Sequence, residues 1–336
     1  MVRPLRAGII GLGRIGSRFD EDLKRNDIWS HAAAYARIPG LTLVAGADLD
    51  TAARAAFQAR RGVSRVYAEY QEMLAKETLD VVSICLPTPL HAEAVLTSAR
   101  ARIRGIFCEK PLAGTIEDGY RIIEQCRRAG SVLAVNYTRR WDRNYLWPRQ
   151  LLQQGFIGRL ERMSGIYSGQ LFNIGTHLID AMLMYAGEVE WVTGERSGPS
   201  EAEDPTVAGL LRFRSGVLGT LLPMPERTDL VFETDLLGTE GRMRIVENGR
   251  RVELYRFRES SHYSGYRELV SIDMPNPLPG SERLVEAIQD LIRCLHNSGQ
   301  PACSGEDALA TLETAAALCR SAQNGGSRQT LMACIR

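Results

Sequence analysis

The sequence predicts a doubly wound α/β domain followed by an α+β domain with a large, mostly antiparallel open sheet. In the first 135 residues, short apolar runs alternate with helical patterns, which is typical of parallel strands joined by helical crossovers. Between residues 190 and 257, β-rich runs follow one another without intervening helices, which favours antiparallel pairing. Because 336 residues exceed a typical single core, we expect two domains, residues 1–135 and 136–336.

The expected elements cover most of the chain. In the first half we expect a strand beginning at Leu5, a helix start after Gly16 that a polar insertion interrupts, and a second helix from about Ser30. Further elements expected there are strands at 41–47, 80–86 and 103–108 and helices at 51–61, 67–76 and 91–102. In the second half we expect strands at 160–168, 190–196, 206–214, 216–223, 230–238, 241–247 and 250–257, and helices at 172–187, 281–297 and 305–324.

The composition argues against several classes of partner. The net charge is +1, with 41 basic and 40 acidic residues, so we expect no nucleic acid and no membrane surface as a partner. No run of 18 apolar residues and no leader pattern is present, and we therefore expect a cytoplasmic protein. Seven cysteines without a Cys-x-x-Cys pair, and five scattered histidines, argue against a disulfide framework and a metal site.

A glycine-rich turn follows the first apolar run. Gly11, Gly13 and Gly16 form a Gly-x-Gly-x-x-Gly pattern, with Arg14 and Ile15 before the last glycine. Gly11 permits the tight turn, Gly13 lets the backbone approach a pyrophosphate, and Gly16 allows close packing of helix and strand. A strand, a glycine turn and a helix N-terminus in this order predict a dinucleotide site, although such turns are also common elsewhere.

Asp48 stands at the end of the second expected strand. An acidic residue in this place can accept hydrogen bonds from the adenosine ribose hydroxyls, and it repels a 2′-phosphate. The sequence therefore favours NAD over NADP as the cofactor. The alternative is that Asp48 only caps the next helix, for which Asp50 and Thr51 are rival caps.

Four motifs in a fixed order identify a family resemblance. The glycine turn is followed by Thr88-Pro89-Leu90-His91, then by Glu109-Lys110-Pro111, and later by a Gly-Thr-His-Leu-Ile-Asp run from Gly175 to Asp180. This order resembles the Gfo/Idh/MocA family of NAD(P)-dependent oxidoreductases, and the resemblance covers nearly the whole chain. It implies a Rossmann domain that binds NAD, a dehydrogenase that acts on CH–OH groups of a small sugar-type substrate, and a homodimer or homotetramer formed through the C-terminal sheet.

The resemblance also implies roles for residues at the strand ends. Lys110 would donate to the substrate oxygen and polarise it, whereas the alternative is a surface lysine paired with Glu109. His91 would lie at the cofactor, although it is expected to cap or pack at its helix start rather than to catalyse. The remaining cofactor contacts that the resemblance implies are made by Pro87, Thr88, Glu109 and Lys110.

Residues 172–187 read as one helix, with Asn173 as its N-cap and Gly187 at its end. His177 and Asp180 are three residues apart and share a face near the N-terminus. The resemblance makes His177 the group that removes the alcohol proton; the alternative is a core histidine satisfied by Asp180. Asn173 departs from the family pattern, because many members have aspartate four residues before this histidine.

Arg140 and Trp141 are the remaining candidates for substrate binding, beside Lys110, Asn173 and His177. An arginine suits a carboxylate or phosphate, and an aromatic ring stacks on a sugar face. The alternative is a latch between domains. Two other functions stay open: an enzyme of the same family that uses bound NAD transiently to cleave glycosides by elimination, and a non-catalytic NAD-binding protein.

Overall fold

The computed structural model describes residues 3–25, 27–197, 203–224, 229–276 and 282–332. The chain divides into two compact units. Unit 1 consists of Met1–Trp141 and Ser281–Leu309, and unit 2 consists of Asp142–Gly280 and Ala310–Arg336. Unit 1 therefore contains residues 281–309. The domain boundary expected from the sequence, at residue 135, places these residues in the second domain.

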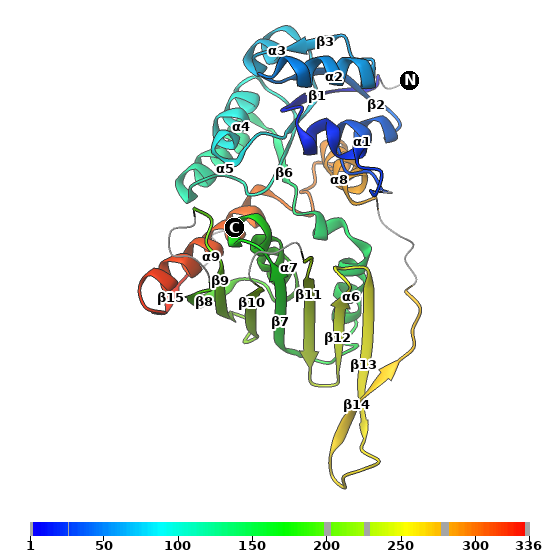
Figure 1. Ribbon diagram of the computed structural model, residues 1–336, viewed down its shortest axis with the longest axis vertical. Helices are drawn as coiled ribbons and strands as arrows, with labels where there is room; N and C mark the ends of the chain where they lie inside the picture. Colours follow the sequence, from blue (N-terminus) through cyan, green and yellow to red (C-terminus); the bar gives the residue numbers. More distant parts are fainter. Residues whose placement is uncertain (1–2, 26, 198–202, 225–228, 277–281, 333–336) are drawn as a thin grey trace. The chain divides into compact units, whose positions relative to one another are not determined.

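Unit 1 is built on a six-stranded parallel sheet with the order β3-β2-β1-β4-β5-β6 (Figure 1). The order reverses between β1 and β4, and ligands of such sheets bind at this switch point, beyond the carboxyl ends of the strands. The doubly wound prediction is thus confirmed. The strands are β1 (Leu5–Ile10), β2 (Leu41–Ala47), β3 (Arg65–Tyr67), β4 (Val81–Ile84), β5 (Gly105–Cys108) and β6 (Val132–Val135).

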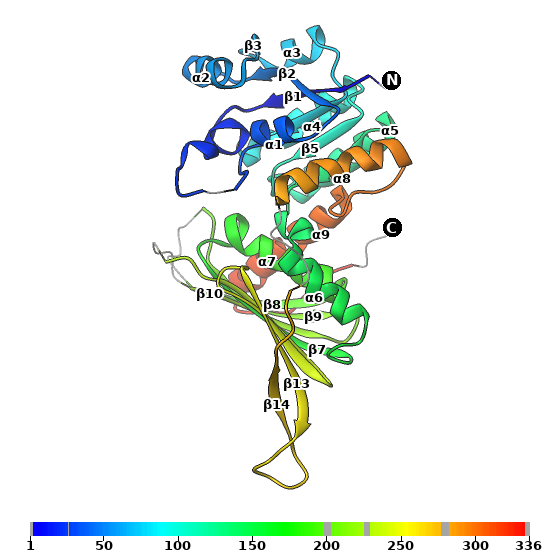
Figure 2. The ribbon, with the colours of Figure 1, turned by 90° about the vertical axis from the view of Figure 1, so that its right-hand side faces the viewer.

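The helices of unit 1 include one from late in the chain. Helix α8 (Arg283–Asn297) packs against α1 and against β5 and β6 (Figure 2). It does so because Leu284, Ile288 and Leu291 recur at helical spacing and form a buried stripe. The other helices are α1 (His31–Arg37), α2 (Thr51–Arg61), α3 (Tyr70–Lys76), α4 (His91–Arg100) and α5 (Ile116–Ala129).

The segment after the glycine turn differs from a standard first helix. It forms a π-helical turn (Arg14–Arg18) and a short 3₁₀ turn (Phe19–Glu21), and α1 begins only at His31, where Ser30 accepts a hydrogen bond from the Ala33 N–H. The predicted insertion and the helix from about Ser30 are confirmed. The helix that was expected to begin after Gly16 is reduced to the single π turn Arg14–Arg18, because the polar insertion follows directly after it.

Unit 2 contains a nine-stranded sheet with the order β14-β13-β12-β11-β7-β10-β9-β8-β15. All neighbouring strands pair antiparallel except β7 and β10, so the mostly antiparallel prediction is confirmed. The strands are β7 (Leu160–Ser168), β8 (Val189–Arg196), β9 (Val207–Phe213), β10 (Leu218–Met224), β11 (Phe232–Gly238), β12 (Gly241–Val246), β13 (Arg251–Glu259), β14 (Arg267–Ile272) and β15 (Gln329–Thr330).

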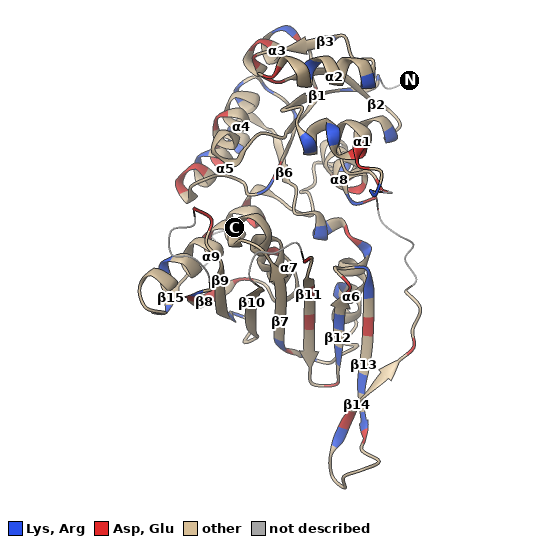
Figure 3. Ribbon diagram, in the orientation of Figure 1, with Lys and Arg blue, Asp and Glu red and all other residues tan. Residues whose placement is uncertain are grey.

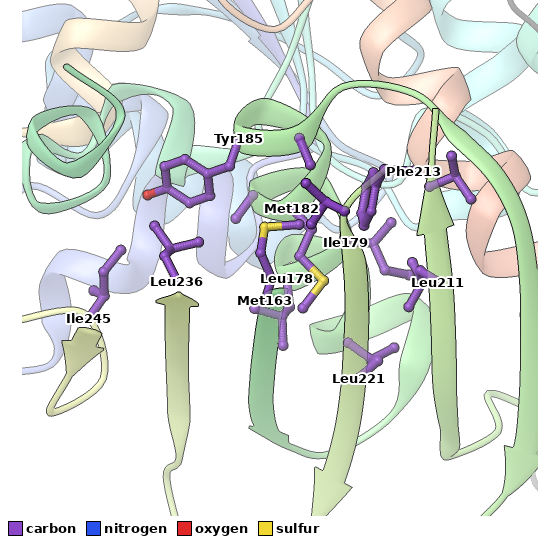
Figure 4. Packing of buried hydrophobic residues seen from close by; sticks show 14 of the residues in the cluster. Met163, Leu178, Ile179, Met182, Tyr185, Leu211, Phe213, Leu221, Leu236 and Ile245 are labelled. Atoms are coloured by element: carbon purple, nitrogen blue, oxygen red, sulfur yellow. The ribbon is translucent and has the colours of Figure 1, made fainter. Parts of the chain in front are cut away.

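Helix α7 (Thr176–Ala186) packs on the sheet of unit 2, where it contacts β7 and β10. The other two helices of this part of the chain are α6 (Arg143–Gln153) and α9 (Gly305–Gln323). Figure 4 shows Leu178, Ile179 and Met182 of α7 pointing into the apolar cluster above the strands. The helix lies close to the sheet because residue 165 is glycine: a Cβ there would lie 2.3 Å from Leu178 Cδ2. This packing fixes the helix that carries His177.

The opposite face of this sheet has a mixed character. Ile166 on β7 and Leu222 on the neighbouring β10 expose 37% and 46% of their surface, which is unusual for large apolar residues. Acidic and basic residues are interspersed on β11 to β13 (Figure 3), and Arg242 pairs with Asp235 there. Among the described residues, no helix is long and apolar enough to cross a membrane.

Candidate active site

The glycine turn at the end of β1 has two obligatory glycines and one open one. Gly11 has a φ of +93°, and a Cβ there would lie 2.6 Å from the Cys85 carbonyl oxygen. A Cβ on Gly16 would lie only 2.0 Å from the Gly11 carbonyl oxygen, whereas one on Gly13 would meet nothing within 4 Å. Gly11 and Gly16 are thus required by the turn itself, and Gly13 presents open backbone of the kind that a pyrophosphate approaches.

Asp48 is tied to this turn. Its Oδ2 accepts a hydrogen bond from the Leu12 N–H at 2.7 Å, and its Oδ1 accepts one from the Asp50 N–H at 2.9 Å. Helix α2 is capped by Asp50, whose carboxylate accepts from the Ala52 N–H, so Asp48 is not the helix cap. A carboxylate has about four acceptor positions, so both oxygens of Asp48 retain capacity for hydroxyl donors.

A buried polar network surrounds Glu109, the residue before Lys110. His31 Nε2 lies 2.8 Å from Glu109 Oε1, and Asn136 Nδ2 donates to the same oxygen at 2.7 Å. The other ring nitrogen of His31 lies 2.8 Å from Ser83 Oγ, which the Tyr35 hydroxyl approaches to 2.6 Å. The network joins α1 to the ends of β4, β5 and β6, and all five residues are buried.

The donors and acceptors of this network match when Glu109 is ionised. Burial alone would raise the pKa of Glu109, but the hydrogen bond and positive charge of His31, the Asn136 amide and the charge of Lys110 outweigh it and hold the pKa below its ordinary value. An ionised carboxylate only accepts, so His31 Nε2 carries a proton. Sequence reasoning missed His31, because 78 residues separate it from Glu109.

We expect His31→Ala to destabilise unit 1 by about 1.5–3 kcal/mol, because it removes a buried hydrogen bond to a charged group.

Glu109→Gln is expected to destabilise unit 1 at neutral pH, because it removes the negative charge that the network favours. Since the pKa of Glu109 is held below the ordinary value of a glutamate, the stabilisation from its charge is present at neutral pH and is lost as the pH falls through that lowered pKa. The difference in the free energy of unfolding between wild type and Glu109→Gln should therefore shrink on acidification; a constant difference would contradict this.

His91 anchors the other side of the Lys110 turn. Its Nδ1 lies 2.8 Å from the Pro111 carbonyl oxygen and its Nε2 lies 2.8 Å from the Leu86 carbonyl oxygen. The ring is buried, as the packing alternative expects, and it joins the loop after β4 to the turn after β5. Buried histidines thus hold the residues on both sides of the half-buried Lys110: His31 contacts the Glu109 side chain, and His91 contacts the Pro111 carbonyl.

Arg140 and Trp141 connect the two stretches of chain that make up unit 1, residues 1–141 and 281–309. The Trp141 indole N–H donates to Asp290 Oδ2 at 3.0 Å, and Arg140 Nη1 donates to the Ala302 carbonyl at 3.0 Å and lies 3.4 Å from Asp307 Oδ1. Trp141 is 3% exposed. These contacts bind residues 281–309 to the rest of unit 1. Contact of Arg140 or Trp141 with a substrate stays a prediction.

The helix predicted over 172–187 is confirmed in its extent, but its expected N-cap is wrong. Residues Leu171–Gly175 form a π-helical turn, and α7 begins at Thr176 after Gly175, so Asn173 is not the N-cap. A carboxylate from another segment binds there instead: Asp204 accepts from the N–H groups of Phe172 at 2.8 Å and Asn173 at 2.9 Å. The helix ends at Gly187, with a φ of +81°, as expected.

The predicted acid–base residues are divided between the units. Lys110 belongs to unit 1, and Asn173 and His177 belong to unit 2. His177 is 9% exposed in the first turn of α7. Asp180 is fully buried one helical turn later and lies 3.4 Å from the Thr311 hydroxyl, which connects α7 to α9.

Comparison with known proteins supports both halves of this description. Residues 5–137 match the model of an oxidoreductase family with an NAD-binding Rossmann fold, and residues 134–330 match the C-terminal α/β domain of the same family. The chain belongs to the Gfo/Idh/MocA oxidoreductase family. As a member of this family it is an oxidoreductase with an NAD-binding domain.

Similar proteins include two named dehydrogenases. The chain is 30% identical over 329 residues to D-apiose dehydrogenase of Paraburkholderia graminis, covering 88% of this chain and 85% of that protein. It is 29% identical over 242 residues to myo-inositol 2-dehydrogenase of Thermotoga maritima, covering 65% and 67%. The WlbA dehydrogenase of Bordetella pertussis, solved with NADH and UDP-GlcNAcA, shares the fold with a TM-score of 0.80 at 23% identity over 98% of this chain and 100% of that one.

Proposed function

We propose that this member of the Gfo/Idh/MocA family is an NAD-dependent dehydrogenase. It transfers hydride between nicotinamide and a secondary hydroxyl or ketone of a sugar, polyol or sugar-nucleotide derivative. The observation that carries the proposal is an open backbone at Gly13 next to the carboxylate of Asp48, at the same strand ends from which Lys110 is presented. Relatives named as apiose and inositol dehydrogenases support the substrate class.

The residues present fit a dinucleotide. A Cβ at residue 13 would meet no neighbouring atom within 4 Å, so the backbone there is accessible to a phosphate group. Asp48 would bind the adenosine ribose hydroxyls, and Arg14, Ile15, Pro87, Thr88, His91 and Glu109 would complete the surroundings of the cofactor. When bound, NAD supplies the hydride acceptor.

In this proposal the side chains of the chain handle the proton and the oxygen. His177 removes the hydroxyl proton as the carbon is oxidised, and in the reverse direction it returns that proton. Lys110 donates a hydrogen bond to the same oxygen and stabilises the negative charge that develops on it. Asn173 orients the imidazole through its amide without adding a full charge.

We expect NAD to bind more tightly than NADP by roughly tenfold or more, about 1.4 kcal/mol, because the Asp48 carboxylate repels a 2′-phosphate. Asp48→Asn is a matched variant, since it keeps the shape and an acceptor for the Leu12 N–H but removes the charge. Its preference for NAD should be weaker. Dissociation constants measured by fluorescence titration test this, and equal or tighter binding of NADP to the wild type would contradict it.

The reaction is tested with a panel of sugars, polyols and sugar-nucleotide acids, by comparing the absorbance of reduced nicotinamide with the amount of product. A one-to-one ratio supports the dehydrogenase. Product without accumulated NADH would instead indicate elimination with transient use of NAD. Binding of NAD with no turnover on any substrate would favour a non-catalytic NAD-binding protein, which the asparagine at position 173 makes worth testing.

We also propose that the open face of the unit 2 sheet pairs with a second copy of the chain, as a homodimer or as half of a homotetramer. Ile166 and Leu222 are register partners on β7 and β10, so their exposed side chains form one contiguous apolar surface. The mass in solution, measured by sedimentation, checks this proposal, and a monomer at micromolar concentration would contradict it.

A further inference from the structure

The turn that carries Asn173 is held by a segment that lies some thirty residues later in the chain. Three consecutive N–H groups of the turn donate to acceptors in that later segment. The Leu171 N–H donates to the Pro205 carbonyl at 2.9 Å, and the Phe172 and Asn173 N–H groups donate to the two carboxylate oxygens of Asp204 at 2.8 and 2.9 Å. One carboxylate thus binds two neighbouring amides.

These bonds matter because the turn has no local cap. Gln170 stands at the N-cap position and makes no side-chain cap hydrogen bond, and the first N–H groups of a helix have no acceptor within the helix. The π turn (Leu171–Gly175) continues directly into α7, so the carboxylate of Asp204 lies at the positive end of the combined helix. Bonds from amides to a charged acceptor are stronger than those to a neutral one.

The charge of Asp204 also acts on the buried Tyr167 hydroxyl and on the partly buried Cys319 thiol. Burial, and then the Asp204 carboxylate, raise the pKa of the Cys319 thiol to about 11 and raise the pKa of the Tyr167 hydroxyl. Tyr167 lies directly under the turn, since a Cβ on Gly175 would be 2.9 Å from Tyr167 Cζ. Tyr167 and Cys319 therefore both favour their neutral forms beside this carboxylate.

We propose that Asp204 is a positioning residue for the reaction: it fixes the turn of Asn173 and thereby the first turn of α7 with His177, and its charge is the reason that residue 173 is an amide. The first part rests on the proposed function of His177. A carboxylate at residue 173 would lie beside the carboxylate that binds the N–H of the same residue. Two neighbouring carboxylates repel each other. At this turn the negative charge is therefore carried by residue 204, and residue 173 is neutral.

The activity test compares Asp204→Ala with Glu203→Ala, a matched control because Glu203 is the neighbouring, exposed carboxylate on the same segment. Asp204→Ala is expected to lower kcat by about 10–100-fold through misplacement of the reacting groups. The KM for NAD should change less than twofold, since the predicted cofactor residues belong to unit 1. A kcat within twofold of wild type would overturn the positioning role, and so would an equal loss in Glu203→Ala.

The charge part is tested by a double-mutant cycle of Asn173→Asp and Asp204→Asn, read by thermal unfolding at pH 8, where both carboxyl groups are ionised. Asn173→Asp should lower Tm more when residue 204 is aspartate than when it is asparagine. Additive shifts in Tm would overturn the charge part of the proposal.

Hydrogen exchange distinguishes failure of this inference from failure of the proposed function. The peptide that spans residues 171–175 should exchange at least tenfold faster in Asp204→Ala, and at the wild-type rate in Glu203→Ala. This readout and the Tm cycle need no substrate. Unchanged exchange would overturn the inference even in an active enzyme; faster exchange with coupled Tm shifts would support it even if His177 proved dispensable for turnover.

Discussion

Alanine at position 177 is expected to lower kcat by about 10²–10⁴-fold, the usual contribution of a general acid–base residue. The affinity for NADH should change much less, because the residues proposed for the cofactor belong to unit 1 and His177 belongs to unit 2. Lys110→Ala should have a similar effect on kcat, since the oxygen would lose its charged donor. Steady-state kinetics on the substrate found by the panel, together with NADH titration, measure both effects.

The chain offers matched controls for these variants. His262 is an exposed histidine on the connection between β13 and β14, and Lys76 is an exposed lysine that pairs with Glu72 on α3. Alanine at either control position should leave kcat within twofold of wild type. Near-normal turnover in His177→Ala would remove His177 from the mechanism, and near-normal turnover in Lys110→Ala would leave Lys110 with no role on the substrate.

Gly16→Ala should disrupt the cofactor turn, whereas Gly13→Ala should leave it folded. The added methyl group at residue 16 would lie 2.0 Å from a backbone oxygen, which cannot move without opening the turn. Overpacking of this kind costs about 1–3 kcal/mol, so Tm should fall and NAD binding should be lost. At residue 13 the methyl group meets no protein atom within 4 Å, so Tm should stay unchanged while NAD binds at least tenfold more weakly.

The contrast between the two glycines tests the assignment of the turn. Thermal unfolding reports on the apo protein, and isothermal titration reports on NAD binding. If Gly13→Ala bound NAD as tightly as wild type, the pyrophosphate would not approach the backbone there. If Gly16→Ala kept both its Tm and its NAD affinity, the turn would be more adaptable than its atomic contacts imply.

The elements that the sequence predicted well are those whose apolar pattern is decided by burial. Residues 41–47 and 51–61 form a strand and a helix with the expected bounds, because the strand is inside the sheet and the helix packs one face on it. The strand β3 is not predicted, since it has only three residues at the sheet edge, the last of which falls in the helix expected over 67–76. The edge strand β14 was missed because its largely exposed side chains follow no apolar alternation.

The site shows the same division. Motifs that lie close together in sequence predict Gly11–Gly16, Lys110 and His177 as site residues, whereas His31 and Asp204 contact residues that are 78 and 31 positions away. No spacing rule links such residues. Asn173 was misread because asparagine before an apolar helical pattern is a favourable N-cap, and a carboxylate from another segment took that role.

The dinucleotide-binding unit is not a contiguous module of the chain. Helix α8 covers β5 and β6, and Asp290 and Ala302 receive the hydrogen bonds of Trp141 and Arg140. A fragment that ended at Trp141 would bare that side of the sheet and leave a buried indole N–H without its acceptor. Chimaeras that exchange cofactor preference with a relative must therefore transplant residues 281–309 along with the first 141, or confine the exchange to the few residues at the glycine turn and Asp48.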